Sequence, residues 1–453
     1  MTESDPSDGS TWTTRVRALV AHPSEPRILV VHAGGPRVPE FELPGSPWVG
    51  EPPEFLAALR ERVGFDSDLL RCVTQSVDQA ARAKSVTLLF AARSGAEVSD
   101  SMAWMSAADV GSLASDQADI AESIRQLLFD LATATINERM PWTNRGWHAD
   151  AEDWLRSTLT DHGTPVVGAI EPILVWELSC VLRAQTVSGP VFFKTALDTP
   201  LFANEASVVA ELAALFPGEV PTPLAVDLDR RLLVLKDAGQ VVGWRAPVET
   251  REDVMRAVAQ LQIRSASHVK RLLAAGCLDR RLDWLAEQTT SWLTQVDLSR
   301  WLSADDVAEL RSAERRLAEI CAELASLPVP HTIVQGDLHL GNVARNEHGF
   351  VIFDWTDACI AHPFIDMIAI RHEEDETIQA RLREAYLAEW RGFGSDEELS
   401  RAWHLAEPLT AFNHAISYVA LWSSIDAEAA DREFGSATRQ FLRTLLDAIR
   451  RDA

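Results

Sequence analysis

Residues 331–367 read HTIVQGDLHLGNVARNEHGFVIFDWTDACIAHPFIDM, a stretch in which polar clusters stand between apolar runs. Residues 332–334 and 351–353 are each typical of a short buried strand, because their side chains are apolar or β-branched. Each run leads into an acidic segment. Together the two segments supply these polar side chains: Asp337, His339, Asn342, Asp354 and Asp357.

Two strands that bring carboxylates to one place suggest a site where those charges meet a cation. A buried carboxylate is costly unless a metal ion or a basic group offsets its charge. Carboxylate and amide oxygens are the hard ligands that Mg²⁺ prefers, and Mg²⁺ accompanies phosphoryl transfer. The other interpretation is a pair of polar turns in which Asp and Asn serve turn geometry. The combined spacing of the acidic residues and Asn342 favours a phosphoryl-transfer site.

This stretch resembles the aminoglycoside phosphotransferase and choline kinase family, the small-molecule branch of the protein-kinase-like fold. The family pattern is H-G-D-x-x-x-x-N, followed by a strand and then D-W or D-x-x. Here QGDLHLGN and FDWTDA stand in those places, and PFIDM matches the start of the helix that follows. Gln335 replaces the first histidine of the pattern, which we interpret as a mild departure.

The resemblance implies a role for each matched residue. Asp337 would be the catalytic carboxylate near the acceptor hydroxyl. Asn342 and Asp354 would hold Mg²⁺ on the phosphates of ATP. Asp366 would be a buried carboxylate that braces the catalytic loop.

The charge of the chain narrows the choice of partners. Its formal net charge is -25, and a nucleic-acid partner is not expected because it requires a basic face. An acidic surface favours a cationic or amino-bearing acceptor over an anionic one. Asp357 and His339 are candidates for contacting that acceptor, although Asp357 could instead cap a turn.

Length and composition indicate a soluble protein of several domains. The 453 residues are enough for two or three domains, and the contents of 47% hydrophobic and 24% charged residues are typical of globular chains. No apolar run approaches the length of a membrane span. Residues 1–10, MTESDPSDGS, predict a disordered tail and no signal peptide, so a cytoplasmic location is expected. The five cysteines are scattered and predict neither a disulfide framework nor a zinc site. The oligomeric state is left open.

Residues 11–135 predict a small α/β domain. Strands are expected near residues 16–20, 27–34, 69–78 and 85–92, with helices near 55–63 and 118–134. This portion resembles a Nudix domain, since a strand and Leu-Pro-Gly precede a helix that carries Arg60 and Glu61. The Nudix box R-E-x-x-E-E-x-G lacks its Glu-Glu pair here, so the resemblance implies the fold without diphosphate hydrolysis. A structural or regulatory appendage is the expected role.

Residues 136–148 predict a linker that docks onto the next domain, and residues 149–238 predict the β-rich N-lobe of the kinase-like fold. Three antiparallel strands are expected between 168 and 196, with Ser188-Gly189 as a turn. Lys194 closes an apolar strand, where a charge has no evident structural use. Such a lysine usually points to solvent, but the resemblance implies contact with the α/β-phosphates.

Three further nucleotide contacts follow from the resemblance. Glu205, on the next helix, would orient Lys194, and Glu211 is the alternative. Ser179 lies in the loop expected to cover the phosphates, which is not glycine-rich, and it could equally be an ordinary turn serine. The strand 231–236 leads into the hinge, where backbone groups of Leu235 to Asp237 would bind adenine.

Residues 239–453 predict the large helical C-lobe. Three tryptophans in its first part could form core or an aromatic wall beside the acceptor: Trp284, Trp292 and Trp301. The acidic run 372–376 could attract an amino group, or could simply begin a helix.

The chain is therefore expected to be an α+β protein, a bilobal protein-kinase-like fold preceded by a Nudix-like domain. The expected activity is ATP- and Mg²⁺-dependent phosphorylation of a hydroxyl on a small molecule, namely an aminoglycoside, a sugar or amino sugar, or an amino alcohol. The alternatives are a pseudokinase that senses nucleotide and a Nudix-type nucleoside diphosphate hydrolase.

Overall fold

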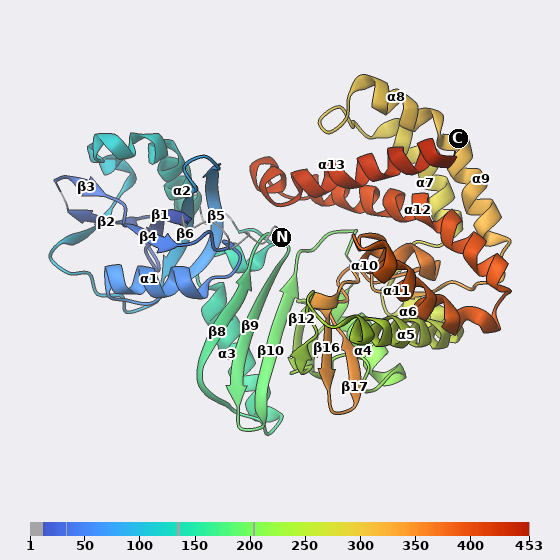
Figure 1. Ribbon diagram of the computed structural model, residues 1–453. Helices are drawn as coiled ribbons and strands as arrows, with labels where there is room; N and C mark the ends of the chain where they lie inside the picture. The colour runs from blue at the N-terminus through green and yellow to red at the C-terminus, as the bar shows by residue number, and fades with distance from the viewer. Residues whose placement is uncertain (1–11, 33, 134–135, 203, 453) are drawn as a thin grey trace. The chain divides into compact units, whose positions relative to one another are not determined.

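The computed structural model of the protein describes residues 12–32, 34–133, 136–202 and 204–452 (Figure 1). The chain divides into two compact units, one ending at Asp198 and the other beginning at Thr199. This division falls inside the predicted N-lobe, residues 149–238. The predicted disordered tail, residues 1–10, lies outside the described residues.

The first unit opens with a mixed sheet. Its strands are β1 (Thr13–Ala21), β2 (Ile28–His32), β3 (Pro36–Arg37), β4 (Glu40–Pro44), β5 (Ser67–Asp78), β6 (Ala83–Ala92) and β7 (Met102–Met105). The order is β3-β2-β1-β6-β5, with β4 paired to β1 and β7 paired to β2. The β1–β6 pair is parallel and the remaining pairs are antiparallel.

One helix covers each face of this sheet. Helix α1 (Pro53–Val63) buries a stripe spaced four residues apart, Phe55, Leu59 and Val63, and packs against one face. Helix α2 (Ala121–Thr133) packs against the other face through Ile124 and Leu128. Two 3-10 turns precede it, η1 (Ala107–Ser112) and η2 (Ser115–Ile120). The predicted α/β arrangement is present, while the likeness to a Nudix domain stays a prediction.

The predicted linker is firmly attached within this unit. It contains η3 (Pro141–Thr143) and leads into α3 (Trp147–Asp161). Trp142 is fully buried, and the Arg145 guanidinium donates to the backbone carbonyls of His22 and Glu25 at 2.8 Å. Arg93, the residue directly after β6, forms ion pairs with Asp68 of β5 and with Glu152 of α3. These ion pairs connect the sheet to α3.

Three antiparallel strands complete the first unit, as predicted. They are β8 (Val166–Val175), β9 (Ser179–Thr186) and β10 (Gly189–Ala196), with β9 paired to both neighbours. The second turn is at residues 187–188, one residue earlier than predicted, because Gly189 already belongs to β10.

The second unit contains short strands at its start and is otherwise mainly helical. It begins with α4 (Glu205–Leu215), the hairpin β11 (Pro223–Asp227) and β12 (Leu232–Lys236), and β13 (Gln240–Val241). The later helices are α5 (Val248–Ser265), α6 (Val269–Ala274), α7 (Leu282–Gln295), α8 (Ala304–Ser312), α9 (Glu314–Ala325), α10 (Ile368–Arg371), α11 (Glu376–Glu389), α12 (Asp396–Trp422) and α13 (Ala427–Asp452). The 3-10 turns η4 (Ala266–His268) and η7 (Trp390–Gly392) follow α5 and α11.

Short strands lie among these helices, and most of them belong to the stretch 331–367 that contains the acidic residues. They are β14 (Leu278–Asp279), β15 (Thr332–Val334), β16 (Val343–Asn346), β17 (Gly349–Ile352) and β18 (Cys359–Ala361), with the 3-10 turns η5 (Leu340–Asn342) and η6 (Pro363–Asp366). They form the sheets β13-β16-β17 and β14-β18-β15. The predicted strand at 332–334 is confirmed, and that at 351–353 corresponds to β17, which ends one residue earlier.

The helices enclose a large apolar core. Trp292 and Trp301 belong to it and Trp284 packs against it, which favours the core interpretation for these residues. The acidic run 372–376 begins a helix, because Asp375 caps α11 by accepting from the backbone N–H groups of Thr377 and Ile378. None of the helices described combines the length and the apolar character needed to span a lipid bilayer.

Candidate active site

Gln335 joins two loops of the second unit, the one that carries Asp337 and the one that carries Asp354. Its side-chain oxygen accepts from the backbone N–H of Asp337 at 2.8 Å. Its side-chain nitrogen donates to the carbonyls of Phe353 and Asp354. A primary amide can accept from one loop and donate to the other at once. The residue that departs from the family pattern therefore ties the backbone of Asp337 to that of Asp354.

Asp366 also holds the loop that carries Asp337. It is 1% exposed, and its two carboxylate oxygens accept from the backbone N–H groups of Gln335 at 2.9 Å and Gly336 at 3.0 Å. Burial raises the pKa of Asp366 to about 7, while the hydrogen bonds from Gln335 and Gly336 act in the opposite direction. These contacts fix the backbone of the two residues that precede Asp337.

Asp354 has a backbone conformation that few residues adopt. Its φ is 60° in the left-handed region, which costs a residue with a Cβ atom about 1 kcal/mol. The Thr356 hydroxyl donates to its Oδ1 at 3.0 Å. Strain of this kind persists only where the surroundings impose it, and it is concentrated at functional sites.

Glu205, at the start of α4, contacts the loop that carries Asp354. Its Oε1 accepts from the Trp355 backbone N–H at 3.0 Å and its Oε2 accepts from the Thr356 hydroxyl at 3.1 Å. Glu211 forms an ion pair with Arg271 instead. Of the two glutamates that the sequence left open, only Glu205 thus makes these contacts with the acidic stretch.

Asn342 completes the set of oxygen donors. It is 7% exposed, and its side-chain nitrogen donates to the backbone carbonyl of Asp337 at 3.1 Å, which leaves its amide oxygen as the atom suited to a cation. Among the described residues, no three or more His, Cys, Asp or Glu converge as a metal site. One carboxylate and one amide nevertheless fit Mg²⁺, which usually takes its other ligands from water and substrate phosphates.

Asp337 lies among other carboxylates. Half of its side chain is exposed, at 52%. Desolvation by the surrounding protein and the charges of Asp357, Asp354 and Asp366 raise its pKa well above the ordinary value. Because the side chain is half exposed, we attribute the direction chiefly to the neighbouring carboxylates. Such a cluster of negative charge is suited to a cation or to a proton in transfer.

An aromatic pair borders Asp337. The His339 ring stacks on the Trp244 ring, with centroids 4.7 Å apart, and the Trp244 side chain is exposed. His339 Nε2 lies 3.7 Å from Asp337 Oδ2, and its Nδ1 accepts from the Gly341 N–H. Burial lowers the pKa of His339, against the effect of Asp354. A side chain at Gly341 would meet the His339 ring at 2.8 Å.

Helix α12 adds two residues that sequence reasoning missed. His414 is buried, with Nε2 3.2 Å from the Gly336 carbonyl, and burial lowers its pKa to about 4. Burial and the charges of Asp337 and Asp357 raise the pKa of Tyr418, which places Tyr418 in the field of the cluster. Asp357 itself packs closely on Gly336, where a side chain would meet its Cβ at 2.6 Å.

The predicted hinge residues lie in the second unit. Leu235 belongs to β12, and the Asp237 carboxylate accepts from the Gly239 N–H at 3.0 Å. Gly239 has φ 107°, and a side chain there would meet the Arg345 carbonyl at 2.4 Å. The chain after β12 therefore turns sharply at a position that requires glycine.

Lys194 and Ser179 lie in the first unit. Lys194 is 9% exposed and stands opposite Val181 in the β9–β10 pair. Its predicted contact with the nucleotide phosphates stays a prediction. Ser179 is 7% exposed, and its hydroxyl oxygen accepts from Trp176 Nε1 at 2.9 Å. This contact lies inside the β8–β9 turn and leaves the predicted phosphate contact untested.

The tip of the β8–β9 hairpin contacts the sheet domain, the part of the first unit that contains β1 to β7. The Val175 N–H donates to the Gly50 carbonyl at 2.8 Å, and the rings of Trp48 and Trp176 meet edge to face. The Trp142 indole donates to the Trp176 carbonyl at 2.9 Å. The hairpin predicted to cover the phosphates is thus in contact with both the sheet domain and the linker.

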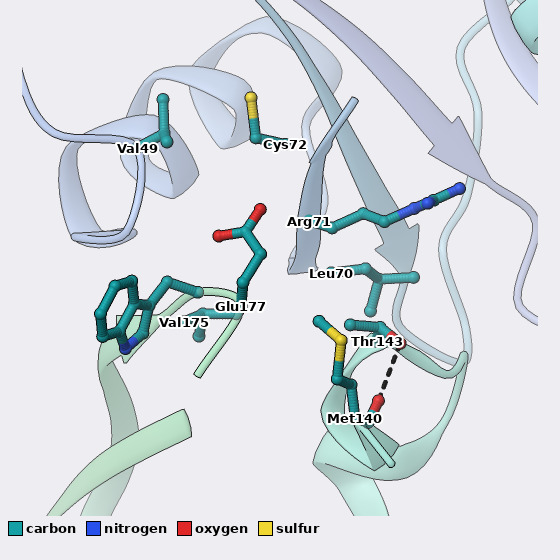
Figure 2. Close-up of a pocket in the computed structure, with 9 residues that line it drawn as sticks. Val49, Leu70, Arg71, Cys72, Met140, Thr143, Val175 and Glu177 are labelled. Carbon is teal, nitrogen blue, oxygen red and sulfur yellow. Dashed lines mark hydrogen bonds between the residues drawn. The ribbon is translucent and has the colours of Figure 1, made fainter. Parts of the chain in front are cut away.

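A small hollow lies at this junction (Figure 2). Glu177 is buried, and its carboxylate points into the hollow, toward Val49 and Cys72. The volume is about 10 Å³, which is room for about one water molecule. The hollow is therefore too small for a substrate.

Helix α1 carries the two residues that the sequence analysis compared with the Nudix box. Arg60 and Glu61 are both exposed, and Arg60 forms an ion pair with Asp66 at 3.3 Å. Metal-dependent diphosphate hydrolysis needs several carboxylates on one face, and the sequence supplies only Glu61 at the place of the box.

Three solved structures are similar to about two thirds of this chain. A macrolide 2′-phosphotransferase type I aligns with 65% of this chain and 97% of its own, at 19% identity and a TM-score of 0.47. A choline/ethanolamine kinase family protein from Mesorhizobium loti aligns with 66% of this chain and 99% of its own, at 16% identity and a TM-score of 0.45. Choline kinase from Streptococcus pneumoniae aligns with 66% of this chain and 98% of its own, at 13% identity and a TM-score of 0.46.

No curated protein sequence matches the chain significantly. Residues 179–404 match the model of the phosphotransferase enzyme family. The match contains Asp337, Asn342, Asp354 and Asp366, together with the loops that hold them. The matched segment, residues 179–404, spans a little under half of the chain.

Proposed function

We propose that the protein is a small-molecule kinase that transfers the γ-phosphoryl group of ATP to a hydroxyl group. The observation that carries this proposal is the arrangement around Asp337, whose loop is tied to Asp354 by Gln335 and braced by Asp366. Phosphoryl transfer depends on positioning and charge more than on covalent chemistry, so rigid placement of these oxygens is what it requires.

Some residues hold the nucleotide through Mg²⁺, and others contact its phosphates directly. Asn342 and Asp354 hold Mg²⁺, which when bound neutralises charge on the transferring phosphoryl group. Lys194 contacts the α/β-phosphates, and Ser179 adds a hydroxyl or a backbone N–H. Glu205 fixes the loop of Asp354 from α4, in addition to the lysine-orienting role that the sequence suggests.

The backbone from Leu235 to Asp237 binds adenine. This assignment is supported by the sharp turn at Gly239 that follows it. The side chains of Leu235 and Asp237 contribute little specificity, because backbone N–H and C=O groups make these hydrogen bonds.

Asp337 aligns the acceptor hydroxyl and receives its proton late in the transfer. Its raised pKa makes it a better proton acceptor than an ordinary aspartate. The acceptor lies beside His339, Asp357 and Tyr418, a surround that is acidic and aromatic. These features favour an amino-bearing alcohol or sugar as the acceptor.

The decisive experiment measures ADP release from Mg-ATP over a panel of aminoglycosides, amino sugars, neutral sugars and amino alcohols. Asp337→Asn is expected to abolish acceptor-dependent release while leaving binding of Mg-ATP largely intact. Removal of Mg²⁺ with EDTA should abolish release in the wild-type protein.

The outcomes separate the alternatives. ATP binding without turnover on any acceptor would favour a nucleotide sensor. Hydrolysis of ADP-ribose-type substrates without ATP would indicate a hydrolase in the N-terminal domain. Loss of nucleotide binding in Asp337→Asn would show that the role of Asp337 is misassigned.

A further inference from the structure

A cavity of about 320 Å³ lies in the second unit among α10, α11 and α12. Its volume is at the lower end of the range for small-molecule sites. The lining is polar and basic in a chain that is strongly acidic overall, and it consists of Ile370, Arg371, Gln379, Ala380, Arg383, Trp403, His404 and Glu407. No residue proposed above to contact nucleotide or acceptor is in this lining.

Arg371 is the most constrained cation of the cavity. Its side chain is 11% exposed and lies over the Trp403 ring, 4.4 Å from the centroid. Its Nη2 donates to the backbone carbonyls of Phe364 and Trp403, and its Nε is buried without a hydrogen-bond acceptor among the described residues. Burial lowers the pKa of Arg371 to about 10. A buried guanidinium with an unused donor is costly unless a ligand offsets its charge.

Arg383 brings a second positive charge to the same cavity. Its charge acts on Arg371 in the direction that lowers the Arg371 pKa, so the two guanidinium groups repel each other. Arg383 makes no hydrogen bond or ion pair with any residue that the structure describes. Two neighbouring like charges, one of them without a partner, are stabilised by an anion placed between them.

The acidic residue of the lining does not balance these charges. Glu407 lies 4.0 Å from Arg371 Nη1, at the limit of an ion pair, and its other oxygen pairs with Arg451 at 2.6 Å. His404 adds a ring to the lining, with Nδ1 2.7 Å from the Ser400 carbonyl. The cavity therefore keeps an excess of donors and positive charge over acceptors.

We infer that this cavity is a second ligand site, which binds the oxyanion group of a small molecule between Arg371 and Arg383. A phosphate monoester and a carboxylate share the required chemistry, since both accept paired hydrogen bonds from guanidinium groups. The site is linked to the acidic cluster, because Arg371 donates to Phe364 and the same turn, η6, carries Asp366.

The test is thermal unfolding of the full-length protein, without Mg²⁺ and in EDTA, at increasing concentrations of inorganic phosphate or of succinate. Sodium chloride at equal ionic strength is the reference. A ligand that binds only the folded state raises the Tm with a saturable dependence on its concentration. We expect saturable stabilisation by at least one of the two probes, and the more effective probe identifies the phosphate or the carboxylate class.

Arg383→Gln is the informative variant, because the substitution breaks no hydrogen bond or ion pair with the part of the chain that the structure describes. It should weaken the apparent affinity about tenfold or more, the effect of removing one charge-assisted hydrogen bond. Arg381→Gln is the matched control. It removes the same charge from the same helix, but Arg381 is paired with Glu249 and Glu252 instead of lining the cavity, so its affinity should stay unchanged.

Two results would overturn the inference. One is stabilisation by neither probe beyond the chloride reference. The other is equal affinity in Arg383→Gln and the wild-type protein, which would place the anion elsewhere, for example at Lys194. A His404→Ala variant gives a second measure of the same site. None of these measurements depends on kinase activity, so the inference and the proposed function can fail independently.

Discussion

At the scale of single residues, the acidic loops are organised by backbone hydrogen bonds more than by side-chain pairs. Gln335 and Asp366 together contact the backbone of residues 335–337 and 353–354. Neither touches the atoms that would react. Their effect is to hold the backbone at Asp337 and Asp354 through hydrogen bonds.

The titration of Asp366 gives a prediction at this scale. A carboxyl whose pKa is raised in the folded state stabilises that state while protonated and loses this contribution as pH rises to the folded pKa. The window for Asp366 therefore runs from about pH 4 to about pH 7. Over it, the advantage of wild-type protein over Asp366→Asn should shrink by up to about 4 kcal/mol.

Chemical denaturation at several pH values in metal-free buffer measures this difference. Taking the variant as reference cancels the histidines and carboxyls whose titration does not depend on the charge of Asp366. An advantage that grows as pH rises through 4 would mean that hydrogen bonds from Gln335 and Gly336 outweigh burial.

At the scale of elements, the β8–β9 hairpin is unusual because residues from outside the hairpin stabilise its turn. In the kinase pattern that the sequence resembles, the corresponding loop covers the phosphates and is rich in glycine, which makes a loop flexible. Here the turn contains Trp176, Glu177 and Leu178 instead, and its stability comes from contacts with Gly50, Trp48 and Trp142. We expect this external packing to restrict the motion of the hairpin.

Gly50→Ala tests this support. A side chain at Gly50 would meet the Trp48 ring at 2.8 Å, so the ring must shift and its edge contact with Trp176 is lost. Hydrogen exchange at the Val175 amide, which donates to Gly50, should become at least about tenfold faster. Gly111→Ala is the control in the same domain, because nothing lies within 4 Å of its added carbon and exchange at Val175 should not change. Equal exchange in both variants would contradict the role of the hairpin contact.

At the scale of the whole molecule, the first unit combines pieces that the sequence assigned to different domains. The sheet domain, the linker and β8 to β10 belong to one compact unit. Arg93, Trp142 and Arg145 connect these pieces. We therefore expect them to unfold together.

Trp142→Ala examines this cooperation. Removing a fully buried tryptophan costs about 3–5 kcal/mol, and the loss should open residues 136–148 to protease. Limited trypsin digestion is expected to cut after Arg145 in the variant and to spare it in the wild-type protein. Trp244→Ala, which truncates a tryptophan that is 62% exposed, should leave the digestion pattern unchanged. Rapid cutting after Arg145 in the wild-type protein would show that the linker is open.

Much of this architecture could be predicted from sequence, because its signals are local. The strands at 168–196 and the loops around Asp337 and Asp354 follow from short apolar runs and from spacing within 37 residues of chain. The parts that could not be predicted depend on contacts across long separations. His414 meets a carbonyl 78 residues earlier, and nothing near position 414 in an apolar helix distinguishes a site residue from a core residue. The attachment of the hairpin to Gly50 has no local signal either.

The contact between Gly50 and Val175 also has a genetic consequence. If the hairpin covers the phosphates as proposed, selection for altered nucleotide use would recover substitutions at positions 48–50. Those positions are far along the chain from every residue proposed to touch the nucleotide. The sheet domain would then be maintained by selection through the loop that it presents to the hairpin.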